Sequence, residues 1–216
     1  MYDLKEILCF GDSNTYGLIP GTCKRYSYDI RWTGILADRF GKDYHIVEEG
    51  LCGRTTIFDD KDRPARNGSE LLPTLLESHM PLDLVIIMLG TNDCKSFYNA
   101  SAKDIGKGII KLIEQIRHFD DNIDILIISP IHLGTDVWQD EYDPEFSKAS
   151  VNVSKQLKNV YKDIAKRYGT DFLAASDYAV AGKADNEHMD EKGHRNLAAA
   201  IYDKIIKKYE SHYVAV

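Results

Sequence analysis

The stretch Ile7-Leu8-Cys9-Phe10-Gly11-Asp12-Ser13-Asn14 decides the fold of this chain. Its first four residues form an uninterrupted apolar run, which is typical of a strand buried on both faces of a sheet. The run stops at Gly11, and three polar residues follow it. A strand that ends in this way places the Ser13 hydroxyl at the carboxyl edge of the sheet, where open α/β sheets bind their ligands. Most serines at such a place are turn residues or helix caps, so the role of Ser13 depends on the rest of the chain.

Apolar runs of strand length alternate along the chain with stretches of helical period. The expected strands are 7–10, 44–48, 84–89, 123–129 and 171–174, and the expected helices are 32–40, 69–79, 105–116, 153–165 and 197–209. This alternation predicts a three-layer α/β/α sandwich around a five-stranded parallel sheet, with the flavodoxin-like strand order 2-1-3-4-5. We expect residues 1–216 to form a single domain.

Composition and charge limit the classes of partner. The formal net charge of -7 disfavours a nucleic-acid partner, which needs clustered lysine and arginine. No apolar stretch reaches membrane-spanning length, so we expect no membrane partner. The first six residues contain no apolar leader, and the four cysteines are scattered without a Cys-x-x-Cys pair. These features favour a cytoplasmic protein.

Three further segments could complete a site around Ser13. Asn92 follows the third expected strand and can aim its amide group at the space above Ser13, although an Asx turn is the commoner role. Gly53 lies in the loop after the second strand, where its backbone N–H can approach another group closely. Asp185 and His188 lie just before the last helix, and a carboxylate three residues away can bind one imidazole nitrogen while the other stays free. His194 is a competing histidine, which we expect to be structural because it lies inside that helix.

Asp12 and Asp93 flank Ser13 and Asn92 in sequence. Two carboxylates so placed allow a metal site, but we favour the interpretation that each accepts backbone N–H groups and holds its turn. We expect Arg54 to pair with one of them.

These segments occur in the order of the four sequence blocks of the SGNH (GDSL) hydrolases, which the chain resembles from about residue 7 to residue 200. The likeness is tightest to the arylesterase/acyltransferase branch, through residues 31–34, 48–51, 54–56 and 81–93. Asn14 replaces the leucine of the GDSL name. Segment 131–147 has no counterpart that we can match.

The resemblance implies a role for each site residue. Ser13 would be the nucleophile, His188 its general base and Asp185 the acid that orients His188. The backbone N–H groups of Ser13 and Gly53 and the side-chain amide of Asn92 would form the oxyanion hole. It also implies that no metal or organic cofactor is needed and that the protein is a homo-oligomer.

The implied function is a serine esterase that hydrolyses small acetyl, short acyl or aryl esters through an acyl-enzyme, with acyl transfer to alcohols as a second activity. A carbohydrate O-acetylesterase is the alternative that uses the same residues. A non-catalytic flavodoxin-like binding module is the alternative from another class, but the first turn lacks a glycine-rich phosphate-binding pattern. Trp32, Phe97 and Trp138 are expected to line the substrate pocket, with Trp138 as the candidate for a lid.

Overall fold

The computed structural model describes residues 4–213, with side chains as far as residue 209. The strands are β1 (Lys5–Gly11), β2 (Tyr44–Gly50), β3 (Leu84–Met88), β4 (Asp124–Ser129) and β5 (Asp171–Ala174). The α-helices are α1 (Ser13–Tyr16), α2 (Trp32–Phe40), α3 (Gly68–Ser78), α4 (Ala102–Phe119), α5 (Lys148–Tyr168) and α6 (Glu191–Tyr213). Four 3-10 helices lie between them: η1 (Gly41–Asp43), η2 (Asn92–Cys94), η3 (Ser96–Tyr98) and η4 (Ala175–Asp177).

The five strands form one parallel sheet in the order β2-β1-β3-β4-β5, which confirms the flavodoxin-like prediction. Strand β1 lies between β2 and β3, and its last residue, Gly11, pairs with Gly50 on one side and Met88 on the other. The loops that follow these three strands therefore begin side by side. This arrangement brings the segments that carry Ser13, Gly53 and Asn92 to one edge of the sheet.

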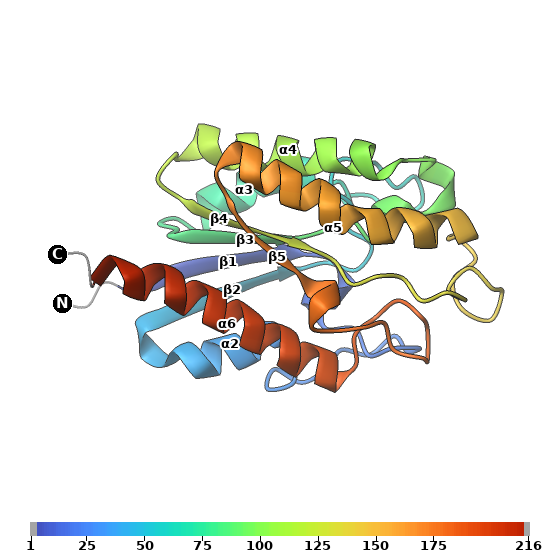
Figure 1. Ribbon diagram of the computed structural model, residues 1–216, viewed down its shortest axis with the longest axis horizontal. Coiled ribbons are helices and arrows are strands. Elements are labelled where there is room, and N and C mark those ends of the chain that lie inside the picture. The colour runs from blue at the N-terminus through green and yellow to red at the C-terminus, as the bar shows by residue number, and fades with distance from the viewer. Residues whose placement is uncertain (1–3, 214–216) are drawn as a thin grey trace.

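Alternate residues of β1 enter two different hydrophobic layers. Leu8 and Phe10 pack with the core side chains of α3, α4 and α5. Ile7 and Cys9 pack with those of α2 and α6. Figure 1 shows the two helix layers on opposite faces of the sheet. Burial on both faces explains why β1 is a continuous apolar run rather than an alternating one.

The structure differs from the sequence prediction most clearly just after β1. Residues 11–31, where no helix or strand is expected, include the single-turn helix α1, whose N-cap is Asp12. The Asp12 side chain accepts a hydrogen bond from the backbone N of Asn14 at 3.0 Å. Gly17 ends the turn in the left-handed region, with φ of 83°. Four residues are too few to produce a helical period, so the pattern of the sequence does not reveal this helix.

Segment 131–147 is folded onto the core although it contains no helix or strand. Leu133, Val137 and Phe146 are buried against the α4 and α5 layer. The backbone N of Leu133 donates to the Ser154 hydroxyl on α5 at 3.1 Å. None of the helices within residues 4–213 is long and apolar enough to cross a bilayer.

The close approach of β2 to α1 generates a stability prediction. A Cβ atom on Gly50 would lie 2.2 Å from the backbone N of Tyr16, so either β2 or α1 must shift to admit it. We expect Gly50→Ala to lower the free energy of unfolding by about 1–3 kcal/mol, as overpacking does. The exposed α4 substitution Lys111→Ala serves as the control, with an expected change within about 0.5 kcal/mol. Urea denaturation measures both, and an unchanged midpoint for Gly50→Ala would contradict the close contact.

Candidate active site

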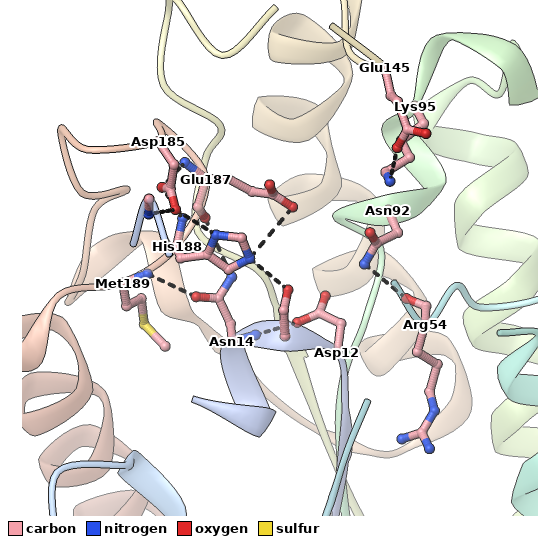
Figure 2. A network of polar contacts seen from close by, with 12 residues as sticks. Asp12, Asn14, Arg54, Asn92, Lys95, Glu145, Asp185, Glu187, His188 and Met189 are labelled. Carbon is pink, nitrogen blue, oxygen red and sulfur yellow. Dashed lines mark hydrogen bonds and ion pairs between the residues drawn. The ribbon is translucent and has the colours of Figure 1, made fainter. Parts of the chain in front are cut away.

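Ser13, His188 and Asp185 form a continuous chain of short contacts at the carboxyl edge of the sheet. The Ser13 hydroxyl lies 2.8 Å from Nε2 of His188. Nδ1 of the same imidazole lies 2.8 Å from Oδ2 of Asp185. Figure 2 shows the imidazole between its acidic neighbours on one side and the turn after β1 on the other. A hydroxyl, an imidazole and a carboxylate in this order can activate the hydroxyl oxygen as a nucleophile.

Asp185 is placed to remain ionised. Its Oδ1 accepts the backbone N–H groups of Glu187 and His188, each at 2.9 Å. Its Oδ2 accepts the backbone N–H of Gly21 at 2.8 Å, besides facing the imidazole. Burial raises the pKa of Asp185, but the hydrogen bonds from His188 and the backbone outweigh it and leave the pKa below its usual value. An ionised carboxylate at this place fixes the imidazole tautomer with the proton on Nδ1.

Asn14 joins the loop that carries His188 to the turn that carries Ser13. Its Oδ1 accepts the backbone N–H of Met189 at 2.9 Å, and its Nδ2 donates to the carbonyl oxygen of Glu187 at 3.5 Å. These two bonds bracket His188 in the sequence. This role of Asn14 is not predicted from the sequence, where Asn14 is marked only as a substitution in the GDSL name, because its partners lie more than 170 residues away.

The structure also brings the loops after β2 and β3 together beside Ser13. The Asn92 amide donates to the carbonyl oxygen of Arg54 at 3.1 Å. The Asp93 carboxylate accepts the backbone N–H of Thr56 at 2.9 Å and also the Thr56 hydroxyl. Gly53, just before Arg54, is buried and has a φ of 84°. Gly53 and Asn92 thus lie on two loops that are bonded to each other, and their role as oxyanion donors stays a prediction.

The expected role of Asp12 in holding its turn agrees with its bond to Asn14, whereas Asp93 accepts from Thr56 and so joins its turn to the loop after β2. The expected pairing of Arg54 with one of these aspartates is wrong. Burial lowers the pKa of Arg54, and of the two aspartates only Asp12 opposes this, through its more distant charge. Within residues 4–213, Arg54 makes no ion pair with either aspartate. Its Nη1 donates instead to the carbonyl oxygens of Gly11, at 2.9 Å, and Glu49. These carbonyls lie at the ends of β1 and β2, and the guanidinium satisfies them there. Burial raises the pKa of Asp12 to about 7, although the backbone hydrogen bond from Asn14 opposes the rise.

Three aromatic residues are expected to line the substrate pocket, and for Trp32 this expectation is wrong. Its side chain is 0% exposed, in the core between the sheet and the layer of α2 and α6, so it cannot line an open pocket. Phe97, on η3, is 55% exposed and remains a candidate. Trp138 is partly buried, donates from Nε1 to the Thr135 carbonyl at 2.9 Å, and has the Lys148 ammonium 4.6 Å from its ring centroid. Its contacts fix Trp138 to its own loop and to the start of α5.

Glu187 is a site residue that sequence reasoning missed. Its side chain is 9% exposed, and Oε1 lies 3.8 Å from Nε2 of His188. Burial raises its pKa, although the charge of His188 opposes the rise. A glutamate in a polar loop is normally solvated, so nothing in the sequence pattern indicated that this one turns inward.

The pKa values of His188 and His194 are shifted in opposite directions. Burial lowers the pKa of His188. The charge of Glu187 and the hydrogen bond with Asp185 raise it by more than burial lowers it, so the pKa is about 9. His194 lies in α6, is fully buried and accepts the backbone N–H of Trp32 at 3.3 Å. Burial lowers the pKa of His194 to about 4, which keeps it neutral. His194 is therefore a structural residue of the core, as expected.

Within positions 4–213, no group of three acidic, histidine or cysteine residues could hold a metal ion. Of the two aspartates beside Ser13 and Asn92, Asp12 accepts a hydrogen bond from its own turn, and Asp93 accepts hydrogen bonds from Thr56 on the loop after β2.

Comparisons with known proteins agree with this geometry. The model of the GDSL-like lipase/acylhydrolase family matches residues 9–197. The aryl esterase of M. smegmatis is 34% identical, with a TM-score of 0.85 over 94% of this chain and 99% of that one. A carbohydrate acetylesterase from Sinorhizobium meliloti is 38% identical, with a TM-score of 0.87 over 94% of this chain and 99% of that one. None of the curated proteins compared with the chain matches it significantly. The chain therefore belongs to the GDSL-like lipase/acylhydrolase family, within the SGNH hydrolases, and is a carboxylic-ester hydrolase.

Proposed function

We propose that the protein hydrolyses small carboxylic esters through an acyl-enzyme on Ser13, with His188 as general base and Asp185 as the acid that orients it. The observation that carries this proposal is the unbroken series of 2.8 Å contacts from the Ser13 hydroxyl through the imidazole to the Asp185 carboxylate. The series lies at the sheet edge where parallel α/β folds bind their ligands.

Acylation begins when the Ser13 oxygen attacks the ester carbonyl carbon and its proton passes to Nε2 of His188. The carbonyl oxygen becomes an oxyanion that accepts hydrogen bonds from the backbone N–H groups of Ser13 and Gly53 and from the Asn92 amide. The bond between the carbonyl carbon and the alcohol oxygen then breaks, and the alcohol leaves with the proton from Nε2. Water attacks the acyl-enzyme in the same way, which releases the carboxylic acid and restores the Ser13 hydroxyl.

The burial of the nucleophile and of its base supports a small substrate. Ser13 is 3% exposed and His188 is 6% exposed. An acetyl or short acyl group needs less space beside these buried residues than a long acyl chain does. Carbohydrate O-acetyl esters are the second candidate, supported by the likeness to the acetylesterase from Sinorhizobium meliloti.

Three narrower expectations accompany this proposal. Acyl transfer to an alcohol uses the same acyl-enzyme, with the alcohol in place of water. A homo-oligomer fits the exposure of Phe97 on η3, since large apolar side chains on a surface often mark contacts between proteins. A cytoplasmic location fits the four free cysteines. All three stay predictions.

Removal of the nucleophile tests the proposal directly. We expect Ser13→Ala to lower kcat/KM for p-nitrophenyl acetate by on the order of 10⁶-fold, as in other serine hydrolases. Ser78→Ala, at an exposed position on α3, is the control and should keep wild-type activity. Equal hydrolysis by wild type and Ser13→Ala would refute the assignment.

Substitution of Asn92 tests whether its amide belongs to the oxyanion hole. We expect Asn92→Ala to lower kcat by about 10²- to 10³-fold with little change in KM, because its hydrogen bond strengthens as the oxyanion forms. Steady-state kinetics with p-nitrophenyl acetate separate the two constants. An unaltered kcat would remove Asn92 from the oxyanion hole.

The electrostatics of His188 predict an alkaline pH dependence. Only the neutral imidazole accepts the Ser13 proton, and a pKa of about 9 keeps the imidazole protonated at neutral pH. The kcat/KM should therefore rise with pH until it levels off above that pKa. Glu187→Gln removes the largest source of the upward shift, so its profile should level off at lower pH. A wild-type profile already flat above pH 7, or one unmoved by Glu187→Gln, would contradict this view of the site.

A further inference from the structure

The carboxylate of Glu187 is largely buried close to Nε2 of His188, and the residue is 7% exposed. Within residues 4–213, the only cationic atom in ion-pair range of it is this Nε2, at 3.8 Å, which is too long for a hydrogen bond. No side chain or backbone N–H of that range donates a hydrogen bond to it. A largely buried carboxylate that depends on solvent for its hydrogen bonds is costly, so a donor supplied by a bound molecule would offset that cost.

The backbone around Glu187 is fixed on both sides. Its N–H donates to Oδ1 of Asp185 at 2.9 Å, and its carbonyl oxygen accepts from Asn14 at 3.5 Å. The preceding residue, Asn186, is in the left-handed region with φ of 61°. The Asn186 carbonyl also accepts the backbone N–H of Gly134 at 2.7 Å, from the loop after β4. These bonds hold the start of the Glu187 side chain on the inner side of the loop, as Figure 2 shows.

The distance from Glu187 to His188 places the carboxylate on the alcohol side of the reaction. The departing alcohol oxygen must come within hydrogen-bond length of Nε2 to receive its proton. Oε1 of Glu187 lies 3.8 Å from that same nitrogen. A hydroxyl on the carbon next to the esterified one can therefore reach the carboxylate while the ester oxygen faces His188.

We propose that Glu187 binds the alcohol part of the substrate by accepting a hydrogen bond from a hydroxyl adjacent to the ester, so that the preferred substrates are monoesters of vicinal diols and polyhydroxy alcohols such as sugars. This inference rests on the proposed function, because it requires the alcohol to leave toward His188. In this proposal, Glu187 creates a preference for alcohols with a hydroxyl next to the ester. Ser13, His188 and Asp185 do not create this preference themselves.

A hydroxyl suits this carboxylate better than a substrate cation does. The imidazole of His188 becomes positive when it takes the Ser13 proton, at the moment when the substrate is held most tightly. The ammonium of Lys95 adds positive potential at Glu187, but the carboxylates of Asp143 and Asp185 oppose it, so the repulsion of a substrate cation depends on His188. A cationic alcohol would be repelled by the imidazolium of His188, whereas a neutral hydroxyl donates its hydrogen bond without that penalty.

The test compares 2-hydroxyethyl acetate with 2-methoxyethyl acetate, in which a methyl group replaces the donor hydrogen of the hydroxyl. We expect wild type to prefer the hydroxyl ester by about tenfold or more in kcat/KM, the typical effect of a hydrogen bond to a charged group. Glu187→Leu should bring this ratio to about one, and Glu187→Gln should lower it by about threefold or more, because a neutral acceptor binds the hydroxyl less strongly. Glu141→Gln, at an exposed position in loop 131–147, is the matched control and should keep the wild-type ratio. A ratio of two substrates cancels any loss of folded enzyme.

The outcomes separate the inference from the proposed function. If wild type hydrolyses p-nitrophenyl acetate and Ser13→Ala does not, but the ratio is near one or survives Glu187→Leu, the inference fails and the esterase assignment stands. If no ester is hydrolysed above the Ser13→Ala level, the proposed function itself fails. Acetylcholine and its neutral analogue 3,3-dimethylbutyl acetate complete the set. A preference for the cation that Glu187→Leu abolishes would overturn the assignment to a hydroxyl.

Discussion

The hydrogen bond between the Ser13 hydroxyl and Nε2 of His188 joins residues 175 positions apart, and the rest of the site depends on it. Neither partner lies in a strand. Ser13 begins the single turn α1, and His188 lies in a loop before α6. The sheet alone therefore cannot fix their separation. The Asn14 side chain does so, because it binds the backbone on both sides of His188 while its own backbone N–H is held by Asp12.

Three carboxylates influence this one imidazole, and their hydrogen bonds give them different roles. Asp185 accepts backbone N–H groups at both oxygens and keeps a low pKa, so it supplies a permanent negative charge. Burial raises the pKa of Asp12 and of Glu187, which accept few or no hydrogen bonds. Their charge is therefore sensitive to pH and to bound molecules. The proton affinity of His188 follows from all three carboxylates, so it can respond to what occupies the site. Of the three, Asp185 alone is hydrogen-bonded to the imidazole and helps to orient it.

The sequence predicted the features that follow from periodicity and from the chirality of parallel sheets. Continuous apolar runs that alternate with amphipathic segments were sufficient to predict the strand order. Because the loops that follow parallel strands meet at one edge of the sheet, the sequence also predicted that Ser13, Asn92 and His188 lie close together. Features decided by single side chains were not predictable. Trp32 begins a helix, where the pattern does not show which face its ring occupies, and the structure buries it. Arg54 binds main-chain carbonyls, which every residue carries and no motif marks. Glu187 turns inward because of the backbone conformation at Asn186, and a local left-handed residue leaves no periodic signal.

Separate hydrogen-bond networks hold the His188 side of the site and the side that carries Gly53 and Asn92. On one side, Asn14 and Asp185 hold His188, the proposed base. On the other, the Asn92–Arg54 and Asp93–Thr56 bonds hold the loops that carry the proposed oxyanion donors. Because these bonds lie within the protein, substrate binding need not reorganise either network, and donors fixed in advance would stabilise a transition state without that cost. Glu187 is the exception, since its carboxylate lacks a protein donor. Substrate discrimination is therefore expected at Glu187, whose carboxylate accepts no hydrogen bond from residues 4–213, and not at the groups proposed to perform the chemistry.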